Sequence, residues 1–362
     1  MARKDISIAN FNLLNLNLPG QPIYDDEGWT QEQYDAKIAF SERVLDDIDA
    51  DIIGFQECWD AAALADIFDR PALRGRYDLV ARTTEPPGIQ VALAVRKGML
   101  QGPPEWIGDL PEDARFIDLR EARDAEESVS VTIRRFSRPL LRVVVNKADG
   151  TPDITVFVAH LKSKGPTSLH RDDDNPVLRR HKFIAQTVVS HVRRMVEAGA
   201  FRAILNDTMR RNDKPVVVLG DLNDGTTSVS TELLTGNPGY RFFAKSTAGN
   251  KSDTGLYTVE KLQQLRSFRH VYYTYIFQNQ MESLDHILVS DSFYDHSSIR
   301  RWSFREMRVL NDHLTATEAE RKRLGYNDHG IIVARFDWNP MVEEAQKILA
   351  EEGRASRSAP IA

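Results

Sequence analysis

Short apolar runs separated by turn-rich polar segments recur along most of the chain. Their length and their richness in Val, Ile and Leu are typical of β-strands that are buried on at least one face. We therefore predict strands over residues 5–14, 51–57, 89–95, 139–145, 153–160, 215–221, 284–290 and 329–336.

Helical patterns occur between some of these strands. Apolar residues recur at roughly helical spacing over 34–48, before the strand at 51–57, and over 177–197, before the strand at 215–221. These segments are predicted to be helices that precede strands. The segments 100–128 and 240–272 are polar and irregular, which predicts long surface loops.

The chain of 362 residues is long enough to form one large α/β domain or two smaller ones. No internal repeat, low-complexity linker or clear boundary interrupts residues 1–340, so one domain is predicted there. Residues 341–362 resemble a final helix that runs into a disordered tail rich in Ala and Ser.

Composition restricts the class of protein. Hydrophobic residues make up 41% and charged residues 28%, as in ordinary soluble proteins, and no run approaches the roughly 18 apolar residues of a membrane helix. The N-terminus enters a strand-like segment at once without the regions of a secretion signal, so a cytoplasmic location is predicted. Cys58 is the single cysteine, which excludes an internal disulfide or a multi-cysteine metal site.

The net charge of −6 provides no general attraction for nucleic acid. A local basic surface or a bound divalent cation can still create positive potential at one site of an acidic molecule.

Polar side chains gather where the predicted strands end or begin. The stretch "PVVVLGDLND" at 215–224, for example, passes from a continuous apolar run to carboxylates and an amide. The chemically capable residues at such positions are Asn12, Asn15, Glu57, His160, Lys162, Lys164, Asp221, Asn223, Asp285, Asp328 and His329.

Each of these groups taken alone has an ordinary structural explanation, because Asp and Asn commonly make turns and caps. Asp224 and Gly225 keep that explanation. A buried carboxylate, however, is costly unless it is paired, hydrogen-bonded or bound to a metal, and the pattern repeats at several strand ends. Carboxylate and amide oxygens without thiolates favour a hard cation, Mg²⁺ or Mn²⁺. The sequence has neither a P-loop nor a Gly-x-Ser-x-Gly motif.

The motifs "FNLLN", "GFQE", "HLKSK", "GDLND", "LDHILVS" and "NDHG" occur in this order over residues 8–332. In identity and order they resemble the endonuclease/exonuclease/phosphatase superfamily, and "FNLLNL", "HLKSKG" and "FSRPLL" are closest to its bacterial nuclease-like members. Two departures occur: Asn327 stands where the family usually has Ser, and "EPPGIQ" at 85–90 lacks an arginine that many relatives have. The resemblance implies a four-layer α/β/β/α sandwich of two mixed sheets.

The resemblance also implies roles for the residues at the strand ends. Glu57 would be the main metal ligand, assisted by Asn12 and Asp328. Asp221 would orient or deprotonate the attacking water, and Asn223 would contact the scissile phosphate or that water. His329, oriented by Asp285, would stabilise charge on the phosphate together with His160. Lys162, Lys164 and Asn15 would bind substrate, Arg138 is a weaker candidate, and Tyr273 and Tyr275 are expected to pack on a sheet.

These roles predict a Mg²⁺- or Mn²⁺-dependent phosphodiesterase that hydrolyses nucleic acid, with DNA as the expected substrate and no membrane involved. One alternative is a phosphatase or phosphodiesterase for inositol phosphates, lipid headgroups or nucleotides. Another is a catalytically silent binding module, which should have lost at least one catalytic residue, whereas all are present. The sequence indicates no obligate protein partner.

Overall fold

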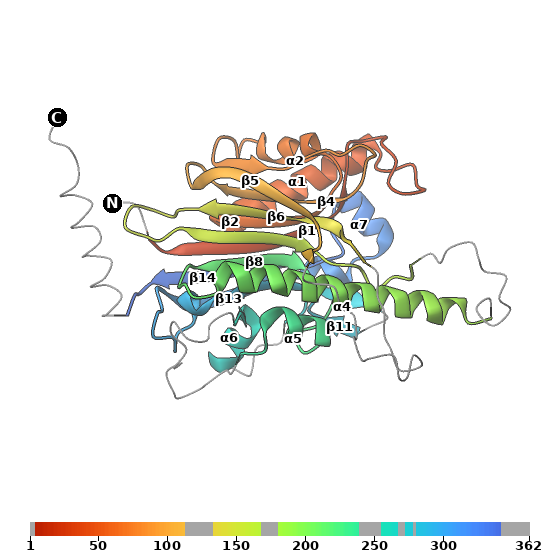
Figure 1. Cartoon of the computed structure of the whole chain (residues 1–362). Helices are drawn as coiled ribbons and strands as arrows, with labels where there is room; N and C mark the ends of the chain where they lie inside the picture. The colour runs from red at the N-terminus through yellow and green to blue at the C-terminus, as the bar shows by residue number, and fades with distance from the viewer. Residues whose placement is uncertain are drawn as a thin grey trace, which may run out of the picture.

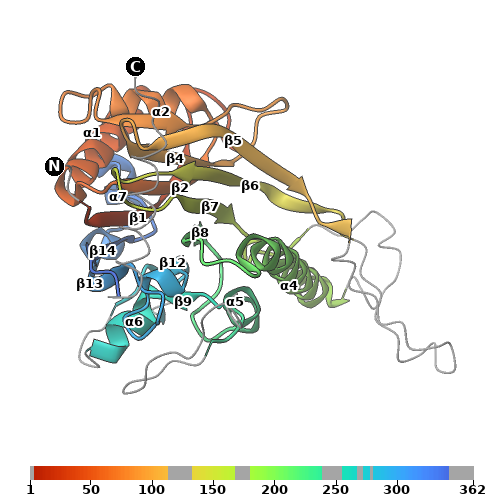
Figure 2. The same ribbon diagram turned by 60° about the vertical axis from the view of Figure 1, so that its left-hand side comes forward.

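The computed structural model describes residues 4–112, 133–167, 180–238, 255–266, 272–277 and 280–341. Two six-stranded mixed sheets pack face to face, with helices on both outer sides (Figures 1 and 2). The predicted four-layer α/β/β/α sandwich is therefore confirmed. No helix in the described part of the chain is both long and apolar enough to cross a bilayer.

The first sheet contains one parallel strand pair, β1 with β2, and its other neighbours are antiparallel. Its strands, in spatial order, are β13 (Trp302–Leu310), β14 (Ile331–Trp338), β1 (Ile6–Leu16), β2 (Ile52–Cys58), β4 (Gln90–Arg96) and β3 (Tyr77–Val80).

The second sheet also contains one parallel pair, β7 with β8. Its strands, in spatial order, are β5 (Leu100–Asp109), β6 (Arg135–Val145), β7 (Ile154–His160), β8 (Val216–Asp221), β12 (Asp285–Val289) and β9 (Tyr257–Thr258). A separate two-stranded ribbon is formed by β10 (Tyr275–Phe277) and β11 (Gln280–Glu282).

Helices cover the outer faces of the two sheets. The described helices are α1 (Gln31–Ile48), α2 (Ala61–Phe68), α4 (Lys182–Met209), α5 (Val229–Thr235), α6 (Val259–Arg266) and α7 (Glu318–Leu324), with short 3₁₀ turns η3 (Asp291–Phe293) and η4 (Asp312–Thr315). Helices α1 and α2 pack on the first sheet, and α4 packs on the second. The first turn of α1 is fixed by a capping box, in which Thr30 and Gln33 satisfy each other's backbone N–H groups.

All the strands predicted from apolar runs are present, as is the helix predicted over 34–48. The helix predicted over 177–197 corresponds to α4, which runs from Lys182 to Met209 in the described chain. The prediction of loops over 100–128 and 240–272 was wrong in part, because Leu100–Asp109 forms β5 and residues 257–266 form β9 and α6. Strand β5 lies at a sheet edge and is mostly exposed, so it tolerates Gly and Pro. These residues made its sequence resemble a loop. The helix and tail predicted beyond residue 341 lie outside the described residues.

The main apolar core fills the space between the sheets. Branched aliphatic side chains from both sheets meet there, among them Ile8 and Leu93 from the first sheet and Val156 and Leu219 from the second. Strands buried on both faces need such continuous apolar runs, which is why the sequence pattern predicted them well.

A glycine allows the two sheets to approach closely next to the strand ends that carry the polar residues. A Cβ atom built on Gly54, in β2, would lie 2.8 Å from the Leu219 Cβ of the other sheet and 3.3 Å from the Asn10 Oδ1. Because Leu219 is held in the core by its own strand, it cannot move away cheaply. Gly54 therefore sets the separation of the sheets three residues before Glu57.

We expect Gly54→Ala to lower the free energy of unfolding by about 1–3 kcal/mol, because it overpacks this contact. Gly88→Ala is the matched control, since a Cβ there meets nothing within 4 Å. Urea denaturation of the two variants and the wild type measures the difference. Equal stability of the two variants would show that the sheets can separate at Gly54 without cost.

Candidate active site

Strand ends from both sheets bring the predicted residues together. In the second sheet, His160 at the end of β7 is in register with Asp221 at the end of β8, and Asp221 is in register with Asp285 at the start of β12. Asn12 on β1 and Glu57 on β2 approach them from the first sheet. Parallel strands end at the same sheet edge, and this topology places the polar groups side by side.

Backbone irregularities occur at two of these residues. Glu57 has φ 60° and Asn223 has φ 55°, in the left-handed region that such residues seldom adopt. The pairing of β2 shifts register on both sides, between Asn12 and Leu16 on β1 and between Phe55 and Cys58 toward β4. Such bulges re-aim side chains and occur often near functional sites.

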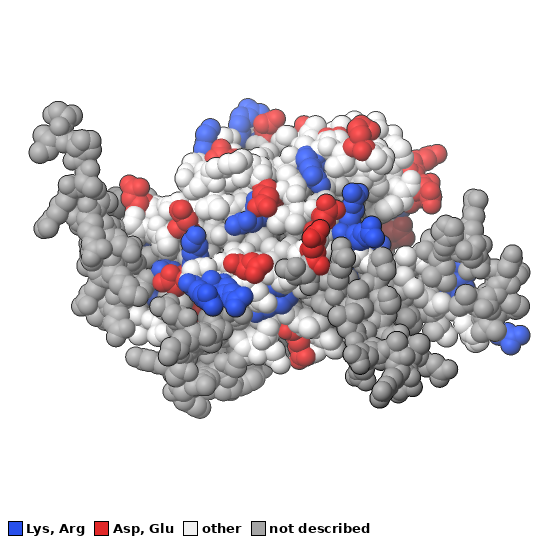
Figure 3. All heavy atoms as spheres, viewed as in Figure 1, with Lys and Arg blue, Asp and Glu red and all other residues white. Residues whose placement is uncertain are grey.

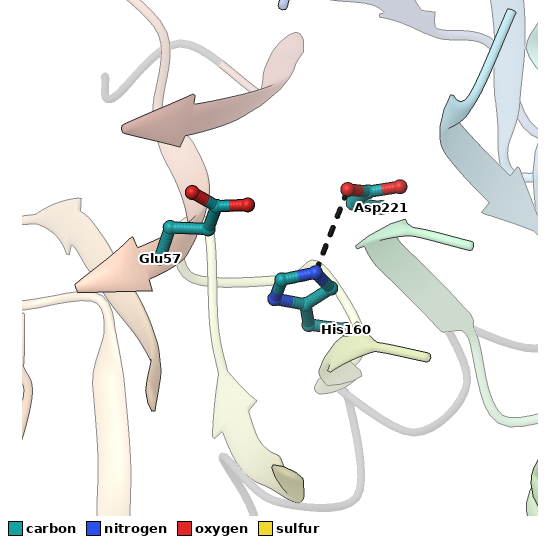
Figure 4. A group of neighbouring side chains, drawn as sticks. All are labelled: Glu57, His160 and Asp221. Atoms are coloured by element: carbon teal, nitrogen blue, oxygen red, sulfur yellow. Dashed lines mark ion pairs between the residues drawn. The ribbon is translucent and has the colours of Figure 1, made fainter. Parts of the chain in front are cut away.

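Glu57, His160 and Asp221 form the centre of the cluster (Figure 4). Their potential ligand atoms all lie within 4.8 Å of one another, and so do those of Asp221, Asp285 and His329. Burial raises the pKa of Glu57, and the nearby Asp328 carboxylate raises it further. Burial also raises the pKa of Asp221, and the negative charge of Asp285 adds to this rise. Burial therefore outweighs the positive charge that His329 supplies to both carboxylates.

Asn12 joins the two sheets at this point. Its Nδ2 lies 3.3 Å from Glu57 Oε1 and 3.2 Å from Asp221 Oδ2, while its Oδ1 accepts a hydrogen bond from the Leu14 N–H at 3.0 Å. In this orientation the Asn12 amide is a donor to both carboxylates, and it would have to turn over to act as the metal ligand that was predicted.

His329 and Asp285 form the pair that the sequence predicted. The His329 Nδ1 lies 2.7 Å from Asp285 Oδ2, and its Nε2 lies 4.0 Å from Asp221 Oδ2. Burial disfavours the charged imidazole, but the carboxylates of Asp285 and Asp221 outweigh it and hold the pKa of His329 well above its usual value. The two carboxylates therefore favour the protonated form of the imidazole, which faces Asp221.

His160 has the opposite character. Its Nε2 lies 3.6 Å from Asp221 Oδ2, and its buried Nδ1 has no hydrogen-bond partner among the described residues. Burial, aided by the charges of Arg138, His329 and Lys162, holds the pKa of His160 well below its usual value. A neutral ring at this position can donate one hydrogen bond to a bound group or offer it one lone pair.

Asn223 and Asn15 support the site through their backbones. The Asn223 N–H donates to Asp221 Oδ1 at 2.8 Å, and its side-chain amide donates to the Leu161 carbonyl at 3.1 Å. The Asn15 N–H donates to Glu57 Oε2 at 3.0 Å, and its side-chain oxygen accepts from the Trp59 indole at 3.0 Å. Both residues thus orient a carboxylate of the cluster.

The two predicted substrate lysines are engaged elsewhere in this structure. The Lys162 Nζ donates to oxygens of its own loop, the Ser163 carbonyl at 3.2 Å and the Gly165 carbonyl at 3.1 Å. The Lys164 Nζ pairs with Glu282. Lys162 nevertheless contacts no carboxylate oxygen among the described residues, so its charge is available to an incoming anion.

Two cations contribute to the site although the sequence offered little reason to select them. The Arg138 guanidinium donates to the Leu161 carbonyl at 3.1 Å and affects the pKa values of both Glu57 and His160. Lys37, which is only 1% exposed, donates to Asn327 Oδ1 at 2.8 Å. The "FSRPLL" motif is a sequence signal that points to Arg138, whereas nothing in the α1 pattern marks Lys37.

Asn327, the departure from the usual family motif, connects Lys37 to the site. Its Nδ2 donates to the Asn12 carbonyl at 2.8 Å while its oxygen accepts from Lys37. Burial lowers the pKa of Lys37 to about 7, against the opposing charges of Asp328 and Glu57. The amide thus ties the segment that carries Asp328 and His329 to β1.

Helix α4 holds strand β6 and the loops that follow β7 and β8 through Arg194 and Glu197, which we call the α4 clamp. Glu197 accepts hydrogen bonds from the Ser137 N–H at 2.8 Å and from the Lys162 N–H at 2.9 Å. Arg194 donates to the Lys162 carbonyl at 3.2 Å and to Asp224 Oδ2 at 3.2 Å. Both clamp residues are no more than 1% exposed. Asp224, expected to be a simple turn residue, is therefore an anchor of the loop that follows Asp221.

The sequence profile of the Endonuclease/Exonuclease/phosphatase family matches residues 30–309. The chain belongs to this family, as the ordered motifs predicted. Members of the family are phosphoester hydrolases, typically dependent on divalent metals, and the clustered carboxylates and histidines agree with that class. No curated protein matches the sequence.

Solved structures share the fold at low sequence identity. A family protein from Bacteroides thetaiotaomicron has a TM-score of 0.52 at 16% identity, over 94% of this chain and 97% of that one. A mannosyl-6-phosphatase of the same organism has 0.51 at 15%, over 92% and 100%. TDP2 of D. rerio, complexed with a single-strand DNA product, has 0.52 at 13%, over 92% and 99%. These likenesses establish the fold and do not identify the substrate of this chain.

We expect Glu197→Gln to lower the free energy of unfolding by about 1–3 kcal/mol, because the new NH₂ group must face a buried N–H donor. Glu232→Gln, at an exposed position of α5, should change it by less than about 0.5 kcal/mol. Chemical denaturation measures both. A Glu197→Gln variant as stable as this control would mean that the α4 clamp does not hold the loops.

Proposed function

We propose that this chain is a Mg²⁺- or Mn²⁺-dependent phosphodiesterase that hydrolyses nucleic acid, with DNA as its substrate. The observation that carries the proposal is the convergence of Glu57 and Asp221, from different sheets, beside the His329–Asp285 pair. Buried carboxylates next to an imidazole whose protonated form is favoured suit a reaction in which water attacks an anionic phosphorus centre.

The donor set fits a hard divalent cation. Glu57, with Asp328 nearby and Asn12 after a turn of its amide, would hold it through oxygen atoms. When bound, such an ion neutralises charge on the phosphoryl oxygens and lowers the pKa of a bound water.

Asp221 would orient the attacking water and accept its proton. One carboxylate oxygen accepts the Asn223 N–H, which fixes the orientation of the group. Its raised pKa increases its affinity for a proton near neutral pH, as a general base requires. Lying opposite, His329 would donate a hydrogen bond to an oxygen that gains charge, while Asp285 keeps its ring oriented.

The nucleic-acid part of the proposal rests on local positive charge. Arg138 forms no ion pair with any described residue, and Lys162 has no carboxylate in contact, yet both act on His160. On the face drawn in Figure 3, the described acidic and basic side chains are interspersed and form no broad basic surface there. With their positive charge, Arg138 and Lys162 would hold a phosphate of the backbone next to the catalytic cluster. The cytoplasmic location stays a prediction from the sequence.

We expect the purified protein to cleave plasmid, linear or single-stranded DNA with Mg²⁺ or Mn²⁺ and to be inactive in EDTA. Asp221→Ala and His329→Ala should each lower kcat by about 100-fold or more, because each removes a group that acts on developing charge or on the attacking water. Asp149→Ala and His181→Ala, at exposed positions outside the cluster, are the matched controls.

RNA, bis(p-nitrophenyl) phosphate and inositol phosphates complete the substrate panel. Cleavage of phosphomonoesters alone would replace the proposal with the phosphatase alternative. If no phosphoester is cleaved with either metal, or if both active-site variants keep full activity, the mechanism is wrong.

Arg138→Gln should raise KM for DNA by about 10-fold and reduce the slope of log affinity against log salt by about 1, because one phosphate contact is lost. Arg135→Gln removes a guanidinium that is highly exposed and paired with Asp109, so it is the control. Cleavage kinetics and binding at several salt concentrations test both variants. An unchanged salt slope in Arg138→Gln would exclude Arg138 from the phosphate contacts.

A further inference from the structure

An exposed aromatic side chain lies at the rim of the candidate active site. Tyr24, in the segment between β1 and α1, is 62% exposed and has φ 52°, a left-handed conformation that is unusual for a bulky residue. Its neighbours hold this conformation, because Ile23 and Asp26 exchange backbone hydrogen bonds at 3.0 and 3.1 Å. The backbone conformation that exposes the Tyr24 ring is therefore fixed by these hydrogen bonds.

A chain of contacts fixes the Tyr24 ring relative to Glu57. The ring meets the Trp59 ring edge-on, with centroids 5.0 Å apart and an interplanar angle of 83°. Trp59 is buried, and its indole N–H donates to Asn15 Oδ1 at 3.0 Å, while the Asn15 N–H donates to Glu57 Oε2 at 3.0 Å. An edge-to-face contact covers at most one face of the tyrosine ring, and with 62% of the residue exposed another face is open to a planar group.

Arg138 links the same ring to the anion-binding side of the site. Burial raises the pKa of Tyr24, the positive charge of Arg138 opposes this and the negative charge of Glu57 adds to it, so both charged groups lie near the phenol. A phosphate held beside Arg138 would thus have a planar aromatic face next to it. Tyr275, by contrast, packs its ring 4.9 Å from the ring of His329 and is only partly exposed.

We propose that Tyr24 is a stacking platform for a nucleobase of the substrate, so that the enzyme selects phosphodiesters that carry bases over bare sugar phosphates or lipid headgroups. This inference rests on the proposed phosphodiesterase function and deepens it by naming the recognised group. Stacking on an exposed aromatic ring accepts any base, because every base has a π-face. The platform therefore confers a requirement for bases and no preference for a sequence.

The test compares binding of two fluorescein-labelled oligomers of equal length in EDTA, oligothymidylate and an all-abasic tetrahydrofuran analogue, by fluorescence anisotropy. The wild type should bind the base-bearing oligomer about 10-fold more tightly than the abasic one. Tyr24→Ala should lose this difference through weaker binding of oligothymidylate alone, whereas Tyr24→Phe should retain it. Phe183→Ala, which removes another highly exposed aromatic ring, is the matched control.

Several results would overturn the platform: no measurable binding of either oligomer by the wild type, equal weakening of both by Tyr24→Ala, or a Tyr24→Phe variant that behaves like Tyr24→Ala. Cleavage with Mg²⁺ or Mn²⁺ is measured separately. A wild type that discriminates between the oligomers but cleaves neither keeps the platform and refutes the hydrolase. A wild type that cleaves both at equal rates, unaffected by Tyr24→Ala, refutes the platform alone.

Discussion

The burial of carboxylates at the junction of two sheets is the constraint on which the rest of this structure depends. Asp221 and Asp285 are no more than 1% exposed, and Glu57 approaches them from the opposite sheet. Charges removed from water in this way are costly unless partners or cations compensate them. The local geometry around the site can be understood as the means by which the protein keeps these groups buried.

Compensation comes from several directions. His329 supplies a cation within the cluster, and Asn12 places one amide between Glu57 and Asp221. Outside the cluster, Lys37 acts through Asn327, and the α4 clamp holds the loops that follow β7 and β8. These contacts fix the shape of the carboxylate cluster but do not neutralise all of its negative charge. This combination favours binding of a metal ion.

Sequence patterns predicted what depends on periodicity and on motifs. The buried strands, helix α1 and the convergence of Glu57, Asp221 and His329 followed from apolar runs that end in polar groups. Strand β5 was missed because an exposed edge strand lacks that periodicity. The orientation of the Asn12 amide, the burial of Lys37 and the clamp role of Glu197 depend on contacts between distant segments, which no local pattern records.

The pairing of the first strand with the last has a consequence for the newly made chain. Strand β14 pairs with β1, and Asp328 and His329 immediately precede β14, whereas Asn12 lies on β1 itself. A ribosome must therefore release almost the whole described sequence before the cluster can close. Until then the growing polypeptide has Glu57, Asp221 and Asp285 without His329, so the candidate active site is complete only when synthesis of the described chain is nearly finished.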